Sequence, residues 1–157
     1  MKPNIALGDE QRQGVVEILS RLLADEYLLY TKTRNYHWNV VGLQFHDLHK
    51  LFEAQYEELD DDVDDVAERI RAVGAPSPGT LAEFVKQAHL TEQPGQVPAA
   101  KDMIAALLAD HEALTRTLRS DVETSASKLG DAGTSDFLTG LMEKHEKTAW
   151  MLRAMLE

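Results

Sequence analysis

Residues 37–70 read HWNVVGLQFHDLHKLFEAQYEELDDDVDDVAERI, and this stretch carries most of the information about the fold. Its apolar residues recur every three or four positions from Leu48 to Ile70, and that spacing predicts an amphipathic helix. Gly74 follows as a C-terminal cap and Pro76 lies beyond it, so the helix is predicted to end there.

Helical periodicity also marks the sequence on both sides of this stretch. A first helix is predicted from a cap at Asp9 to about Tyr36. A third helix closes near Gly130, and Thr134 or Ser135 is expected to cap a fourth. The apolar positions that define these three helices are Val15, Leu19, Leu22 and Leu29, then Met103, Leu107, Leu114 and Leu118, then Phe137, Leu141 and Leu152.

The connections between the helices differ in length. Gly42 lies in a short turn between the first two helices, whereas residues 74–98 hold four of the five prolines. Within that segment Leu81, Phe84 and Val85 keep a helical spacing, which predicts a small helix. Two short connections and one long one predict an all-α, ferritin-like four-helix bundle with a short extra helix in the long crossover between helices 2 and 3.

Length and composition limit the classes of protein. With 157 residues and 43% hydrophobic content, the chain suits a single domain over residues 1–157, with a short N-terminal tail at 1–8. The net charge of −11 argues against nonspecific attraction to phosphate backbones and suits either cation binding or plain solubility. The absence of cysteine excludes disulfides and thiolate metal sites, and no apolar run is long enough to span a membrane. A cytoplasmic protein is therefore expected.

Histidine and carboxylate side chains gather in the second helix and just before it. Four of them share one face of that helix at about 100° per residue, namely His49, Glu53, Asp64 and Glu68. Imidazole and carboxylate together suit ferrous iron and its ferric product. Because roughly 22 Å of helix separates His49 from Asp64 at 1.5 Å per residue, these side chains cannot bind one metal within one subunit.

A site split between two subunits would satisfy this geometry. A second copy of the helix, lying antiparallel across a two-fold axis near residues 56–59, would bring the two halves together. His49 and Glu53 would then lie beside the acidic half of the partner helix. His37, near the end of the first helix, would join them because the short turn after Val40 folds the chain back.

The same residues admit a structural interpretation, in which a carboxylate-rich helix is only a solvated face. Four histidines are interpreted as surface or core residues rather than ligands: His46, His89, His111 and His145. The usual intrasubunit di-iron bundle needs Glu-x-x-His on two helices, and the chain contains no such pair. That absence favours the split site over a classical di-iron bundle.

The HWNV motif at residues 37–40, and the spacing of the histidine and acidic residues after it, resemble the Dps family, or miniferritins, named as DNA-binding proteins from starved cells. The resemblance extends from Val15 to Leu156 and includes the closing segment AWMLRA at 149–154. It implies a twelve-subunit shell with two-iron ferroxidase centres at its two-fold interfaces and a cavity that stores ferric mineral. The ligands that it implies are His37, His49 and Glu53 of one subunit with Asp64 and Glu68 of the partner subunit.

Several positions add detail to this resemblance. Many relatives have Asp where this chain has Glu53, so altered geometry or affinity is expected rather than loss of the centre. Trp38 is expected either to be oxidised, which would stop damaging radicals from escaping, or to pack at the dimer interface. The resemblance also implies three-fold channels lined by residues 130–136, where Asp131 and Asp136 are the available carboxylates.

The predicted function is a ferroxidase that oxidises Fe(II), stores ferric mineral in a homododecamer and protects against oxidative damage. Hydrogen peroxide is the expected oxidant, with dioxygen as the other possible substrate. One alternative is a DNA-binding protein that compacts the nucleoid, with incidental iron chemistry. Another is a metal-free helical interaction module. The first eight residues carry only Lys2 as a basic residue, and the chain ends in Leu156-Glu157, so DNA binding is not expected.

Overall fold

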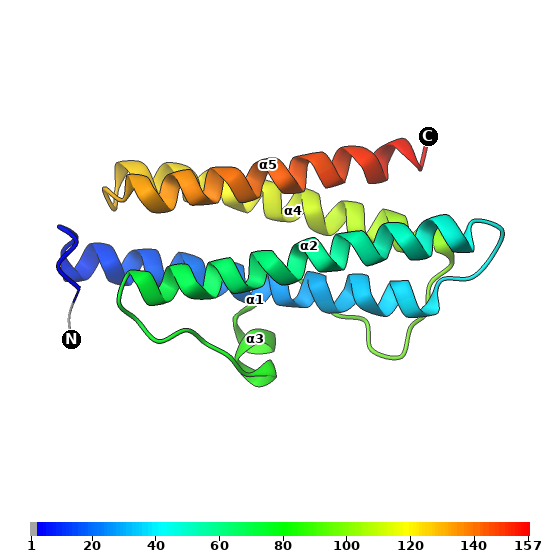
Figure 1. The fold of residues 1–157 in the computed structure, drawn as a ribbon, viewed down its shortest axis with the longest axis horizontal. Coiled ribbons are helices and arrows are strands. Elements are labelled where there is room, and N and C mark those ends of the chain that lie inside the picture. Colours follow the sequence, from blue (N-terminus) through cyan, green and yellow to red (C-terminus); the bar gives the residue numbers. More distant parts are fainter. Residues whose placement is uncertain (1–2) are drawn as a thin grey trace.

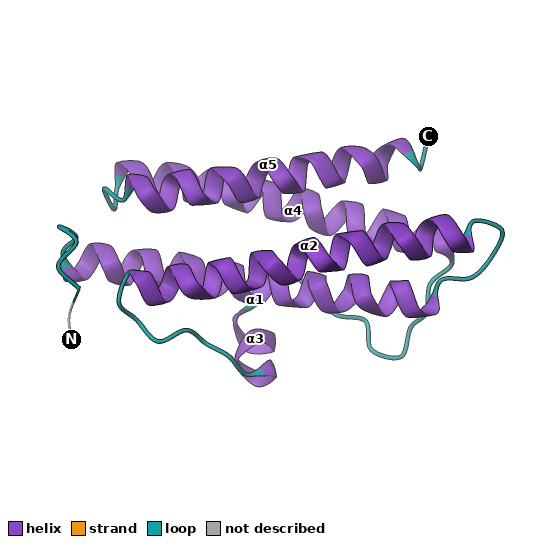
Figure 2. Ribbon diagram, in the orientation of Figure 1, coloured by secondary structure: helices purple, strands orange, loops and turns teal. Residues whose placement is uncertain are grey.

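The computed structural model describes residues 3–157, so Met1 and Lys2 lie outside the described part of the chain. Within that part all regular secondary structure is helical (Figure 2). The helices between residues 3 and 157 are α1 (Asp9–Asn39), α2 (Phe45–Ala72), α3 (Leu81–Gln87), α4 (Ala100–Ser127) and α5 (Ala132–Ala154). None of them combines the length and the apolar character needed to cross a membrane. The prediction of an all-α fold is confirmed.

Two helical hairpins form the bundle. α1 and α2 run antiparallel and pack along their lengths, and so do α4 and α5 (Figure 1). The segment between α2 and α4 crosses from one end of the bundle to the other, so α2 and α4 run in the same direction. α3 lies in this crossover and packs against α1. This arrangement confirms the predicted four-helix bundle with a short extra helix in its long connection.

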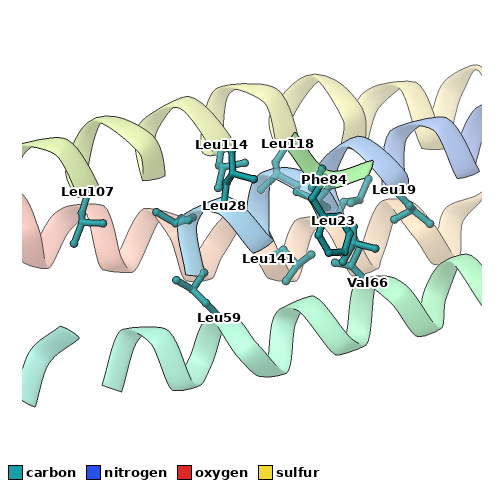
Figure 3. Close-up of a cluster of buried hydrophobic side chains, with 14 of the residues drawn as sticks. Leu19, Leu23, Leu28, Leu59, Val66, Phe84, Leu107, Leu114, Leu118 and Leu141 are labelled. Carbon is teal, nitrogen blue, oxygen red and sulfur yellow. The ribbon is translucent and has the colours of Figure 1, made fainter. Parts of the chain in front are cut away.

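The core lies between the two hairpins and is made mainly of leucine (Figure 3). Buried leucines come from all four long helices, including Leu19, Leu23, Leu28, Leu59, Leu107, Leu114, Leu118 and Leu141. Phe84 is the buried residue of α3, and its ring stacks on Tyr27 of α1 with the ring centroids 4.5 Å apart. That aromatic contact holds the crossover against α1.

The predicted cap of α1 at Asp9 is wrong by one residue. Gly8 occupies the N-cap position, and its backbone N–H donates to the side-chain oxygen of Gln11 at 2.8 Å. Asp9 is instead the first helical residue, where its negative charge favours the helix dipole. At the other end α1 continues to Asn39, beyond its predicted end, and therefore includes His37.

The predicted cap of α5 is also wrong, because Asp131 takes the N-cap position in place of Thr134 or Ser135. The Asp131 carboxylate accepts the Thr134 backbone N–H at 3.0 Å and pairs with Arg69 of α2 at 3.2 Å. The cap residue of α5 is therefore also joined to α2 by an ion pair.

The ends of α2 and α4 agree with the sequence. α2 has Val73 as its C-cap, and Gly74 follows with a φ of 98°, which glycine adopts without steric cost. α4 has Lys128 as its C-cap, and Gly130 follows with a φ of 65°. Both predictions of helix ends near glycine are confirmed.

Candidate metal centre

His37 and His49 face each other across the short turn that joins α1 to α2. Their rings stack with centroids 3.8 Å apart and 20° between the ring planes. The Nδ1–H of His37 donates to the backbone carbonyl of His49 at 2.8 Å, and the Nδ1–H of His49 donates to the carbonyl of His37 at 2.9 Å. These reciprocal hydrogen bonds join the two helix ends and orient both rings.

The same hydrogen bonds decide which nitrogen of each ring can bind a metal. A neutral imidazole whose Nδ1 donates a proton carries its free lone pair on Nε2. A backbone carbonyl that accepts from the other ring nitrogen is a common way of orienting a metal-binding histidine. His37 is buried and His49 half-buried, with Tyr56 against the first ring and Phe45 against the second. The pair therefore offers two oriented nitrogen ligands.

Glu53 lies one helical turn after His49 and is partly exposed. Its carboxylate pairs with Lys50. The hydrogen bond from Lys50 is the main cause that lowers the pKa of Glu53, so the carboxylate is ionised at neutral pH. Because this ion pair is open to water, it contributes little stability, and an incoming cation can replace Lys50 at small cost.

Asp64 and Glu68 lie farther along α2 and are exposed. Roughly 22 Å of helix separates Asp64 from His49. Across the described residues of a single subunit, no group of three or more histidine, aspartate or glutamate side chains is placed to hold a metal ion. One subunit thus brings together only the histidine half of the predicted site, and the intersubunit arrangement stays a prediction.

An aromatic cluster that was not predicted borders the histidine pair. The guanidinium carbon of Arg34 lies 5.4 Å from the ring centroids of Trp38 and Tyr56 and 5.7 Å from that of Tyr30. Tyr56 meets the ring of His37 edge-on, with centroids 5.2 Å apart. Trp38 is 65% exposed within one subunit. The available sequence signal was the four-residue spacing of Tyr30, Arg34 and Trp38, which places them on one side of α1.

A polar cluster at the centre of the bundle was not predicted either. Glu26, His111 and His145 come from α1, α4 and α5, and all three are buried. Asp62 of α2 is also buried and pairs with Lys144 of α5, and burial raises the pKa of Asp62 to about 6. His111 and His145 thus lie in the core. The other two histidines interpreted as structural are exposed: His46 and His89.

The two suspected channel carboxylates differ in their surroundings. Asp131 is only 6% exposed, and its carboxylate accepts a hydrogen bond from Thr134 and pairs with Arg69. Burial alone would raise the pKa of Asp131, but the hydrogen bonds from Thr134 and the charge of Arg69 outweigh burial and lower it. Asp136 is exposed. Of the two residues, Asp136 is therefore the better placed to meet a passing cation.

The sequence of this chain is similar to those of known proteins. The ferritin-like domain family matches residues 16–157. An uncharacterized low temperature-induced protein of Nostoc sp. is 52% identical, and the matched region covers 98% of this chain and 86% of that protein. DNA protection during starvation protein 2 of Bacillus anthracis is 38% identical, with 90% of this chain and 96% of that protein covered.

Solved structures agree with these sequence relatives. A Dps protein from Vibrio cholerae O1, described as a member of a broad superfamily of ferritin-like diiron-carboxylate proteins, matches with a TM-score of 0.92 and 32% identity. That match covers 100% of this chain and 98% of the Vibrio chain. A Dps protein from Bacillus brevis matches with a TM-score of 0.90 and 33% identity, covering 96% of this chain and 100% of the other.

Proposed function

Because the chain belongs to the Dps family of ferritin-like proteins, we propose that it oxidises ferrous iron at centres shared between two subunits and stores the ferric product. The observation that carries this proposal is the His37–His49 pair, whose reciprocal hydrogen bonds leave two Nε2 atoms for a metal. The ionised Glu53 lies one turn away. Neutral imidazole and carboxylate are ligands that suit ferrous iron.

The proposed reaction uses these residues in two ways. The imidazoles of His37 and His49 bind the incoming ferrous ions, and the carboxylates stabilise the more highly charged ferric product. Glu53, with Asp64 and Glu68 of the partner subunit, supplies the negative charge that favours the ferric state. Each of two ferrous ions gives up one electron, and hydrogen peroxide takes up both as its O–O bond breaks, which yields two hydroxide ions. This paired transfer avoids the hydroxyl radical that a single ferrous ion would generate.

The half-site in each subunit favours a two-fold assembly. In such a dimer α2 lies antiparallel to α2 of the partner, and symmetry produces two centres at each interface. The family resemblance extends the proposal to a dodecameric shell around a ferric mineral, located in the cytoplasm. Large apolar side chains exposed near the α1–α2 turn fit burial between subunits, namely Trp38, Val41, Leu43 and Phe45.

Anaerobic titration followed by rapid mixing tests the proposal. Metal-free protein titrated with Fe(II) without oxygen should saturate at about two ferrous ions per subunit, as a two-metal centre requires. Mixing the loaded protein with hydrogen peroxide or dioxygen should then give ferric absorbance faster than iron in buffer alone. Anaerobic binding that does not saturate would favour the metal-free helical module instead.

DNA binding is the alternative function that some relatives' names raise. With a net charge of −11, the assembled protein is expected not to retard plasmid DNA at neutral pH without divalent cations, because repulsion from phosphates opposes contact. A gel-shift assay across a salt series measures this. A variant with an added lysine-rich N-terminal extension serves as the positive control. Retardation of the unmodified protein that weakens steeply with salt would support the DNA-compacting alternative.

A further inference from the structure

Two histidines meet at the centre of the bundle with both rings buried. His111 of α4 and His145 of α5 are each 2% exposed, and their Nδ1 atoms lie 2.9 Å apart. The other ring nitrogen of His145, Nε2, donates to Oε1 of Glu26 at 2.7 Å, and Glu26 of α1 is 0% exposed. One chain of hydrogen bonds therefore connects α1, α5 and α4.

The hydrogen bonds and charges around the two rings determine which ring binds an added proton. A doubly protonated His145 donates from both nitrogens, to Glu26 on one side and to His111 on the other. Burial alone would lower the pKa of His145, but the negative charge of Glu26 and its hydrogen bond outweigh burial and raise it. Burial and then the charge of His145 hold the pKa of His111 well below its usual value. A proton added to this pair of rings is therefore favoured on His145 rather than on His111.

Within the described structure, none of the charged groups around the rings is hydrogen-bonded to His111, and Gln55 of α2, which lines the cavity beside them, has an unpartnered side-chain amide. Asp62 of α2 already pairs with Lys144 of α5, and Glu58 of α2 is exposed. Because Nδ1 of His111 accepts from His145, neutral His111 carries its proton on Nε2, which has no hydrogen-bond partner among the described residues. A second proton would have to enter at Nδ1, which faces the protonated Nδ1 of His145. The cavity beside both rings has a volume of about 10 Å³, which has room for one water molecule at most. A second imidazolium would be neither paired nor properly hydrated there.

We propose that the Glu26–His145–His111 chain is an acid-sensitive contact, which accommodates one added proton on His145 and loosens α4 from α5 when a second proton enters His111. The two like charges would then stand close together on buried rings, where their repulsion is poorly screened. α4 and α5 are the most extensively packed pair of helices in the described structure. The proposal is independent of the ferroxidase function.

The direction of the pH dependence follows from proton binding. Below the ordinary histidine pKa of about 6.5, an opened bundle binds a proton at His111 that the closed bundle disfavours. Acid therefore shifts the equilibrium toward opening. Where the opened bundle binds one proton more than the closed bundle, the opening constant rises about tenfold for each unit by which the pH falls.

Hydrogen exchange of the assembled protein measures this opening. Exchange of amides in α4 and α5, corrected for the intrinsic effect of pH, gives opening constants between pH 7 and pH 5. The wild-type constant should rise about tenfold more per pH unit than that of His111→Gln. His89→Gln, which replaces an exposed histidine, is the matched control and should follow the wild type. Groups common to all three proteins, including Asp62, contribute equally to each.

A second variant and the response of the wild type to pH provide two further tests of the proposal. His111→Leu provides another neutral replacement should His111→Gln fail to fold, and it should show the same reduced acid response. Equal pH slopes in the wild type and the His111 variants would overturn the proposal. So would a wild-type opening constant in α4 and α5 that does not rise between pH 7 and pH 5.

Discussion

Replacing His49 by alanine should abolish rapid ferrous oxidation while the helical bundle persists. The substitution removes one Nε2 ligand and the ring that stacks on His37, whereas the backbone carbonyl of residue 49 still accepts the Nδ1–H of His37. Loss of such an orienting bond alone costs about 10- to 100-fold in metal affinity or activity, and loss of the ligand should cost more. Asp64→Ala, which removes a carboxylate from the acidic half of the proposed centre, should have a comparable effect. Stopped-flow absorbance measures the rates, and circular dichroism measures the helix content.

Mixing the two variants distinguishes a shared centre from two independent defects. After dissociation and random reassembly, half of the dimers would combine His49→Ala with Asp64→Ala, and each would hold one intact and one doubly altered centre. About a quarter of the wild-type centres should therefore reappear. His46→Ala, which replaces an exposed histidine near the start of α2, is the matched control and should keep full activity. Properly mixed dimers without recovered activity would contradict the split site.

The sequence predicted the helices well because their apolar residues repeat over many turns. It predicted the caps poorly, since the partners of a cap residue can lie far along the chain. Asp131 caps α5 and also pairs with Arg69 of α2, a contact across the bundle that periodicity does not encode. The helix ends at Gly74 and Gly130 were easier to predict, because positive φ angles are a local property of glycine.

The sequence predicted part of the site for a similar reason. The four-residue spacing of His49 and Glu53 places them on one face of a helix, whatever the rest of the fold. The reciprocal bonds between His37 and His49 depend on the turn at residues 40–44, whose path the sequence did not specify. His111 and His145 were interpreted as ordinary structural histidines, because a contact between separate helices leaves no mark in local spacing.

Removing the Asp131 side chain should destabilise the subunit by about 2–3 kcal/mol, since Asp131→Ala deletes both a helix cap and a buried hydrogen-bonded charge. It would leave Arg69 without this partner and the first amides of α5 uncapped. Asp131→Asn keeps a cap oxygen but loses the charge, so a smaller cost of about 1 kcal/mol is expected. Denaturant unfolding at neutral pH, compared at equal protein concentration, measures these differences.

Asp136→Asn is the matched control, because Asp136 is exposed and affects α5 mainly through the helix dipole, at about 0.3–1 kcal/mol. The pH dependence separates the two residues further. Because the folded state lowers the pKa of Asp131, its contribution is present above the ordinary carboxyl pKa of about 4 and is lost as the pH falls through the lowered value. The stability gap between wild type and Asp131→Asn should therefore close only in strong acid. If Asp131→Asn instead left stability unchanged and slowed oxidation at limiting Fe(II), the carboxylate would be guiding iron rather than capping α5.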